Sequence, residues 1–196
     1  MNQIIKQRIE DSISIKTRIL NNQSLISQIE NLTLAIQNIF TYNGKIFFAG
    51  NGSSFADSMH LAAEFVSRFQ QERQPLPAIA LGANNANLIA IGNDYTFEDV
   101  FARELKALGC FEDIFIGIST GGNSENLIRA IDTATQDVGM KAYCLTGETG
   151  GMLKEHAECI CVPSTITARI QEAHILIGHI VCELVEEAFI KKQQQQ

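Results

Sequence analysis

From residue 45 onward, short apolar runs alternate with segments whose apolar residues recur at helical spacing. Apolar runs of this length are typical of strands that are buried on both faces of a parallel sheet. Alternation of strands and helices predicts right-handed βαβ units, so we expect an α/β fold with helices on both faces of the sheet. The predicted strands are residues 45–49, 78–81, 114–118, 142–145 and 159–162, and the predicted helices are residues 54–69, 84–91, 97–108, 124–138, 150–156 and 168–190.

Two further helices are predicted ahead of the first strand, at residues 3–20 and 23–40. They connect no strands, so their apolar faces must pack on the sheet or on another subunit, and we expect a helical oligomer interface. The 196 residues are most simply a single domain. Within it, residues 1–41 would serve oligomerisation, residues 42–190 would form the α/β core, and the tail at 191–196 is expected to fray.

Composition excludes several classes of function. A net charge of −7 without a basic cluster argues against nucleic-acid binding. No apolar stretch approaches the roughly 20 residues of a membrane span, and the polar start of the chain does not resemble a signal peptide, so a cytoplasmic protein is expected. The five cysteines are predicted to be reduced core thiols. A zinc site at Cys159 and Cys161 is disfavoured, because their spacing is not that of usual ligands.

The hexapeptide Ser119–Ser124 follows the apolar run 114–118 and precedes a helical pattern. Its three hydroxyls and two glycines therefore lie at a helix N-terminus, where free N–H groups and the helix dipole favour a phosphate. The Lys of a nucleotide-binding P-loop is absent, so a sugar phosphate fits better than a nucleoside triphosphate. The alternative is a simple helix N-cap, in which Ser119, Thr120 or Ser124 satisfies the first helical donors. Gly50-Asn51-Gly52 is not a dinucleotide fingerprint, because Phe55 occupies the third glycine position.

His60 and Glu64 are four residues apart on the helix that follows the first strand, so they share one face. Together they suit either a divalent metal or acid/base chemistry. A solvated surface contact is the alternative, but the helix around them is mostly apolar, which favours a paired or functional role.

The last helix carries Gln171 and His179 within an apolar pattern. Eight residues separate them, about 80° around the helix and about 12 Å along it. They converge on one point only if both side chains lean inward or if different subunits contribute them. A lone histidine in such an apolar run is more often a satisfied core residue, and spacing alone does not settle the role of His179.

Several long segments together resemble the sugar isomerase (SIS) domain and, more narrowly, the phosphoheptose isomerase family. They read AGNGSSFADSMHLAAEF, AIGNDYTFEDVF, IGISTGGNSENLI, LTGETGG and RIQEAHILIGHIVCELVE, and the similarity runs from about Gly44 to Glu187. The resemblance implies a doubly wound five-stranded sheet, a homotetramer with active sites between subunits, and one zinc ion per subunit. The two leading helices also suit that family.

The resemblance also implies residue roles. It assigns the zinc site to His60, Glu64, Gln171 and His179, and the acid/base pair to Glu64 and His179. Besides Glu64, the residues that match substrate-binding positions are Asn51, Gly52, Ser53, Asn93, Asp94, Ser119, Thr120, Gly121, Ser124 and Gln171. Two positions depart from the pattern: the loop at 51–54 lacks a second glycine that many members have, and Gly121 replaces a serine of some members.

The implied reaction converts sedoheptulose 7-phosphate into D-glycero-D-manno-heptose 7-phosphate, the first step toward the heptose of lipopolysaccharide or surface glycans. Two other functions remain open. Some relatives of the family are tetramers that bind a replication initiator protein and lack the acidic residue and the histidine that match Glu64 and His179, which this chain keeps. A sugar-phosphate sensor or an amino-sugar isomerase would leave the full set of four polar residues unexplained.

Overall fold

A computed structural model of the chain describes residues 1–194 and contains a five-stranded, fully parallel sheet. Its strands stand in the order β2-β1-β3-β4-β5. Their bounds are β1 (Ile46–Gly50), β2 (Ala78–Ala80), β3 (Ile114–Ser119), β4 (Lys141–Thr146) and β5 (Glu158–Cys161). All strands run the same way, but β2 is added on one side of β1 and β3 on the other, so the order of strands switches between β1 and β3. In open α/β sheets, ligands bind beyond the carboxyl ends of the strands at such a switch point.

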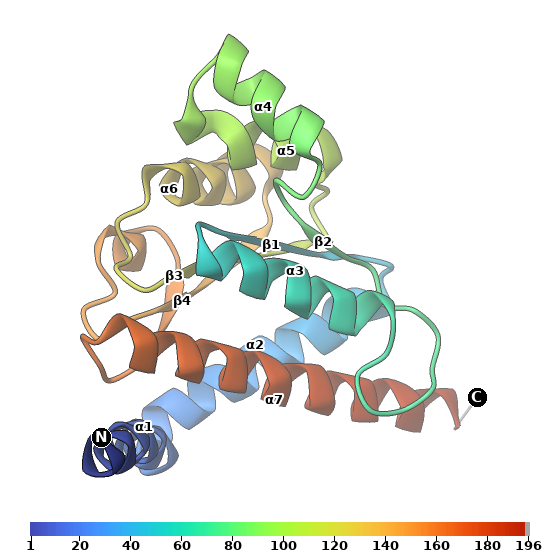
Figure 1. Cartoon of the computed structure of the whole chain (residues 1–196). Coiled ribbons are helices and arrows are strands. Elements are labelled where there is room, and N and C mark those ends of the chain that lie inside the picture. The colour runs from blue at the N-terminus through green and yellow to red at the C-terminus, as the bar shows by residue number, and fades with distance from the viewer. Residues whose placement is uncertain (195–196) are drawn as a thin grey trace.

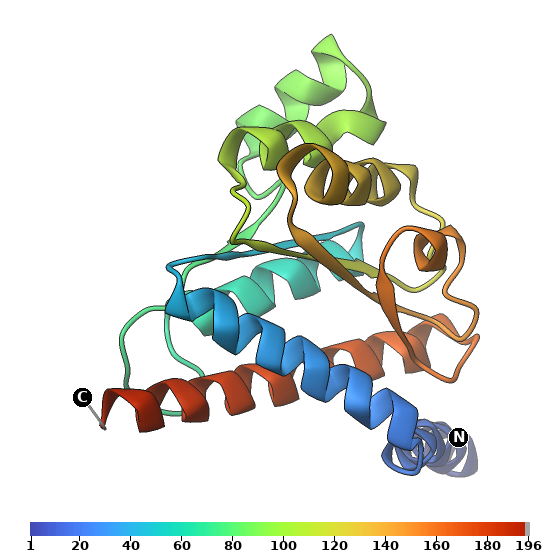
Figure 2. The same ribbon diagram turned by 180° about the vertical axis from the view of Figure 1, so that it is seen from behind.

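Helices cover both faces of the sheet (Figures 1 and 2). On one face lie α2 (Gln23–Thr41), α3 (Ser53–Val66) and α7 (Thr167–Gln193), with α1 (Asn2–Leu20) packed against α2 and α7; on the other lie α4 (Asn85–Asp94), α5 (Val100–Leu108) and α6 (Glu125–Asp132). Short helical turns at Phe97–Asp99 and Met152–Glu155 complete the structure of the described residues, together with a π-helical segment at Thr133–Val138 that continues α6.

Two apolar clusters fill the spaces between the sheet and its helices, because successive strand residues point to opposite faces. In β1, Ile46 and Phe48 join the cluster beneath α2, α3 and α7, whereas Phe47 and Ala49 join the cluster beneath α5 and α6. All five residues of β1 are buried, as expected for a strand covered on both faces. The predicted α/β fold is confirmed.

The end of α3 differs from the prediction. Apolar spacing predicts a helix through residue 69, but α3 ends at Val66. The chain leaves the helix there because the carboxylate of Glu186, far along the sequence on α7, accepts hydrogen bonds from the backbone N–H groups of Phe69, Gln70 and Gln71. A distant acceptor thus outweighs a local helical preference.

The tail also differs from the prediction. α7 continues through Gln193, so residues 191–193 are not frayed. Two lysine contacts explain the extension: Lys191 Nζ pairs with Glu187 at 3.3 Å, and Lys192 Nζ donates to Thr41 Oγ1 at 3.1 Å. Residues 195 and 196 of the predicted tail lie outside the described residues.

All five cysteines are free thiols, and three of them, Cys144, Cys159 and Cys182, are fully buried. Cys161 is partly buried, but Cys110 is exposed and is therefore not a core thiol. Over residues 1–194, none of the helices combines the length and the apolar character that crossing a membrane requires.

His174 on α7 predicts a pH dependence of stability. Its ring is 1% exposed and its Nε2 lies 3.1 Å from the carbonyl oxygen of Thr146. Burial lowers the pKa of His174 to about 4, although the hydrogen bond to Thr146 opposes the shift. Below the ordinary histidine pKa of about 6.5, His174 of the unfolded chain binds a proton, whereas His174 of the folded protein stays neutral until the pH approaches 4. We therefore expect the free energy of unfolding to fall by up to about 3 kcal/mol between pH 6.5 and 4 from this group.

Urea unfolding across this pH range measures the effect. His174→Gln is the matched variant, because its amide can still donate to Thr146 but does not titrate. We expect it to show a shallower decline with falling pH than the wild type. Equal declines in both proteins would contradict this account of His174.

Candidate active site

A cleft of about 420 Å³ opens at the carboxyl ends of β1 and β3. Three segments that are distant in sequence meet there: the loop that follows β1, the hexapeptide that follows β3, and the first turns of α7. The lining residues are Asn51, Gly52, Ser53, Ser54, Ile118, Ser119, Thr120, Gly121, Asn123, Ser124 and Gln171. The structure therefore brings together eight of the residues predicted to bind substrate.

The hexapeptide forms a tight turn in which Ser119 Oγ accepts the Gly122 N–H at 3.1 Å. Gly122 has a φ of +67°, and a Cβ there would lie 2.1 Å from the carbonyl oxygen of Gly150. Only glycine fits, because the turn is pressed against the loop that follows β4.

Ser124 occupies the N-cap position of α6, but among the described residues its side chain makes no capping hydrogen bond. Its Oγ lies 3.3 Å from Ser119 Oγ instead. The Ser124 side chain therefore does not cap α6. Its hydroxyl faces the cleft together with the N-terminal end of α6, where backbone donors and the helix dipole favour an anion.

A reciprocal amide pair holds the other wall of the cleft. Asn51 Nδ2 donates to Asn126 Oδ1 at 2.9 Å, and Asn126 Nδ2 donates to Asn51 Oδ1 at 3.0 Å. Asn126 is buried on α6, so the pair ties the loop after β1 to the helix that begins at the hexapeptide. The Asn51 side chain is thus held in place rather than free to reorient.

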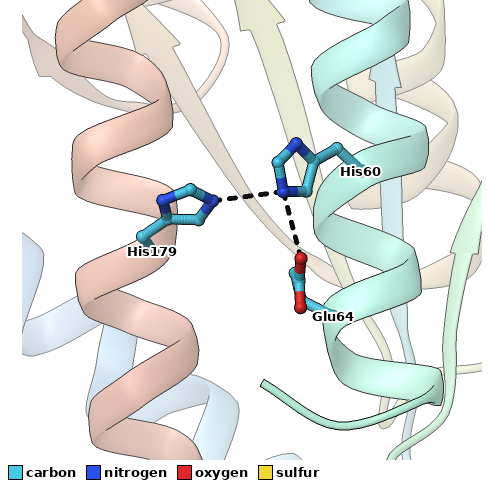
Figure 3. Close-up of side chains that lie close together, drawn as sticks. All are labelled: His60, Glu64 and His179. Atoms are coloured by element: carbon cyan, nitrogen blue, oxygen red, sulfur yellow. Dashed lines mark hydrogen bonds and ion pairs between the residues drawn. The ribbon is translucent and has the colours of Figure 1, made fainter. Parts of the chain in front are cut away.

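A second polar cluster lies farther along α3 and α7 (Figure 3). His60 and Glu64 project from α3, and His179 projects from α7 to meet them. His60 Nε2 lies 3.1 Å from Glu64 Oε1 and 3.2 Å from His179 Nε2. The second oxygen of Glu64 points away from both imidazoles (Figure 3).

The donor atoms of this triad fit a divalent cation. They all lie within 4.8 Å of one another, and ligands of a tetrahedral zinc ion lie roughly 3.3–3.6 Å apart. The Nε2 atom of His60 faces both the other imidazole and a carboxylate oxygen, and one N–H can serve only one of them well. A cation among the three atoms would satisfy all of them. Two imidazole nitrogens and a carboxylate oxygen are the ligand types that zinc prefers.

Close packing of α3 and α7 brings the triad together. A Cβ at Gly178 would lie 2.6 Å from Leu61 Cδ2, so the residue before His179 must be small for the helices to approach this closely. Two other groups face the triad. The ring of Phe69 lies 5.3 Å from the His179 ring. Burial raises the pKa of the Asp57 carboxyl, and the nearby His60 and His179 oppose that shift.

Three predicted site residues lie elsewhere: Gln171 is not with the triad, and Asn93 and Asp94 are not in the cleft. The Gln171 amide donates to Ser53 Oγ in the cleft, two helical turns before His179. Asn93 and Asp94 lie exposed at the end of α4, where Asn93 Nδ2 donates to Asp94 Oδ1 at 2.9 Å. Neither of these two lines the cleft, and Figure 1 shows α4 on the opposite side of the sheet from α3 and α7.

Sequence reasoning missed Asp57, Phe69 and Asn126. Asp57 lies three residues before His60, and helical spacing was a sufficient signal to find it. Phe69 was assigned to a helix that in fact ends earlier. Asn126 acts through a partner 75 residues away, which no local pattern reveals.

Comparison with known proteins gives consistent matches. A family model described as the SIS domain matches residues 9–147. The phosphoheptose isomerase of Aneurinibacillus thermoaerophilus is 47% identical over 98% of both chains. Phosphoheptose isomerase 2 of Campylobacter jejuni is 46% identical over 98% of this chain and 96% of its own. The solved phosphoheptose isomerase of Francisella tularensis is similar with a TM-score of 0.87 and 36% identity, covering 94% of this chain and 97% of its own.

Proposed function

The chain belongs to the SIS-domain family and, within it, to the phosphoheptose isomerases, and on that premise we propose that it converts sedoheptulose 7-phosphate into D-glycero-D-manno-heptose 7-phosphate. It is thus an isomerase enzyme acting on a sugar phosphate. The product feeds the synthesis of heptose for lipopolysaccharide or surface glycans. We place the reaction in the cytoplasm, which the five free thiols support.

One observation carries the proposal: the cleft and the triad of His60, Glu64 and His179 lie in line along the same two helices. Gln171 meets Ser53 at the cleft, and His179 meets His60 two turns later, so α3 and α7 run parallel and in step. The seven residues from Ser53 to His60 span about 10 Å of helix. A phosphate at the cleft would therefore place the far end of an extended sugar chain, with its reacting carbons, beside the triad.

Ketose–aldose conversion moves a proton between C1 and C2 through an enediol. The cleft holds the phosphate and orients the chain, and such positioning lowers the barrier by several kcal/mol. Glu64 takes the proton from carbon, and the oxygen that points away from the imidazoles is free for this step (Figure 3). His179 would donate and accept protons at the substrate oxygens through Nδ1, because its Nε2 is the nitrogen that faces the triad. General acid–base transfer of this kind contributes roughly 10²–10⁴-fold in rate.

His60, Glu64 and His179 would hold a zinc ion. Gln171 lies two turns of α7 before His179 and is bound to Ser53, so a fourth ligand at its position would have to come from another subunit. Zinc at this position would polarise the substrate oxygens as a Lewis acid. The convergence of three donor atoms supports this assignment. His60 on this account orients its neighbours rather than moving a proton.

A scaffold role, in which the chain binds a replication initiator protein without catalysis, is less well supported. A scaffold role does not explain why the side chains of Glu64 and His179 converge. A coupled turnover assay with sedoheptulose 7-phosphate, run with and without a chelator, tests the proposal. We expect turnover that the chelator removes and zinc restores. No turnover by the zinc-loaded protein, or faster turnover of an amino-sugar phosphate, would contradict it.

We propose a homotetramer in which α1, within residues 1–41, forms contacts between subunits. The expectation that α2 does the same is wrong for its apolar face, because Leu25, Ile29, Leu32, Ile36 and Ile39 are already buried within their own chain. Ile5, Ile9 and Ile13 follow one another at four-residue spacing along α1, and each is more than half exposed. An apolar stripe of this kind needs a partner. In such an assembly another subunit can present Asn93 and Asp94 of its α4 to the cleft, which would complete an active site between subunits.

The predicted tetramer can be disrupted by charge. Light scattering should report four chains for the wild type and smaller species for the double variant Ile5→Glu, Ile9→Glu, because two buried carboxylates would face an apolar interface. Ser14→Glu is the matched control, since it lies exposed on the opposite side of α1. A wild type that is monomeric and fully active would contradict both the tetramer and the shared site.

A further inference from the structure

A buried ion pair connects the end of α3 to α7. Arg73 Nε lies 3.0 Å from Glu186 Oε2, and both side chains are at most 2% exposed. The same carboxylate accepts the backbone N–H groups of Phe69, Gln70 and Gln71 at 2.7–2.8 Å. Burial disfavours the charged carboxylate, but these N–H donors and Arg73 outweigh that effect, and the pKa of Glu186 is lowered.

Arg73 reaches in the other direction, to the last turn of α3. Its Nη2 donates to the carbonyl oxygen of Glu64 at 2.8 Å, and its Nη1 donates to those of Phe65 at 2.8 Å and Gln74 at 3.0 Å. The carbonyls of Glu64 and Phe65 belong to the last turn of α3 and have no partner within the helix, and a guanidinium satisfies such groups well; that of Gln74 lies in the following loop. The backbone of the proposed catalytic base is thus held directly by Arg73.

Glu186 lies seven residues after His179, on nearly the same face of α7. Six hydrogen bonds therefore join the helix of Glu64, the loop after it and the helix of His179 into one unit. Phe69 belongs to this unit, because its N–H is bound by Glu186 while its ring lies 5.3 Å from the His179 imidazole.

A buried ion pair is a poor source of stability, because removing two charges from water costs about as much as their attraction returns. The ion pair of Arg73 and Glu186 is better explained by the geometry that it imposes on α3 and α7. We propose that Arg73 and Glu186, acting through the backbone of Glu64 and the ring of Phe69, are positioning residues that set the distance between Glu64 and His179. The inference rests on the proposed roles of those two residues.

Glu186→Gln tests the inference in the zinc-loaded enzyme, because it keeps the shape but removes the charge and one acceptor. We expect kcat with sedoheptulose 7-phosphate to fall about 10- to 100-fold, as for a small misplacement of reacting groups. KM should change less than about threefold, since the phosphate cleft lies at the other end of α3 and α7. Zinc affinity, measured by competition with a chromophoric chelator, should fall about 10-fold or more.

Asp113→Asn is the matched control. Asp113 is a carboxylate buried to a similar degree, which also accepts two backbone N–H groups, from Lys45 and Cys110, and pairs with Lys45 Nζ at 2.8 Å. It lies at the amino ends of β1 and β3, away from the triad. Its loss should lower thermal stability but leave kcat and zinc affinity within about twofold of the wild type.

Phe69→Leu keeps the ion pair of Arg73 and Glu186. It tests the positioning role if Glu186→Gln does not fold. We expect a fall in kcat of about 3- to 10-fold at unchanged KM. Normal kcat and zinc affinity in a folded Glu186→Gln, or in Phe69→Leu when the former is unfolded, would overturn the positioning role. A wild type without turnover would instead count against the proposed function, and its zinc affinity would still report on the geometry.

Discussion

Glu64→Gln should lower kcat by about 10²–10⁴-fold, the usual contribution of a general base. Glutamine keeps the length and one oxygen of the side chain, but its amide cannot accept a proton from carbon. The side chain is one quarter exposed, so its loss of charge should change folding little. KM for the sugar phosphate should stay within about threefold, because the phosphate cleft does not include this residue.

Two measurements separate a lost base from a lost metal. Deuterium incorporation at C1 of the ketose substrate and at C2 of the aldose product, followed by NMR in heavy water, reports proton abstraction directly, and we expect it to cease in Glu64→Gln. Metal analysis shows whether zinc remains bound, and we expect about one ion per chain in the wild type. Glu155→Gln is the control, since Glu155 is exposed on the short helical turn before β5. Near-normal exchange in Glu64→Gln would mean that another residue is the base.

The sequence predicts the sheet well because its information is local. Each strand is mostly a buried apolar run, with exposed Lys141 and Glu158 only at the first positions of β4 and β5, so the observed bounds lie close to the predicted ones. The end of α3 was predicted wrongly for the opposite reason. Phe69 extends the helical pattern, and only Glu186, 117 residues later, shows why the helix stops.

The sequence also predicts the active site only in part, because contacts within one helix follow from spacing and contacts between helices do not. The spacing of His60 and Glu64 places them on one helical face, and the 3.1 Å contact between them follows from that spacing. Their meeting with His179 depends on how closely α3 and α7 pack, which is set by Gly178 against Leu61. A pattern along one helix cannot reveal a fit between two helices. Gln171 and His179 illustrate the limit, because the structure turns the first toward Ser53 and the second toward His60.

Replacing Ser119, Thr120 and Ser124 together with alanine should lower kcat/KM by at least about 10²-fold, mainly through KM. Hydrogen bonds to a charged group contribute about 1.5–3 kcal/mol each, and a tenfold change corresponds to about 1.4 kcal/mol. Contributions from neighbours are not additive, so the sum of three is an upper bound. Calorimetric titration with the sugar phosphate measures the loss in binding.

Ser119 also accepts the Gly122 N–H within the turn, so part of the effect of the triple variant is structural. Ser124→Ala separates the two causes, because the Ser124 hydroxyl does not cap its own helix. It should raise KM with little loss of thermal stability. Asn22→Ala is the opposite case: Asn22 caps α2 through the Leu25 N–H at 3.1 Å, so its loss should cost about 1 kcal/mol of stability and leave KM unchanged. If KM stays normal in the triple variant, the phosphate must bind elsewhere. The alignment of cleft and triad along α3 and α7 would then no longer support the proposed function.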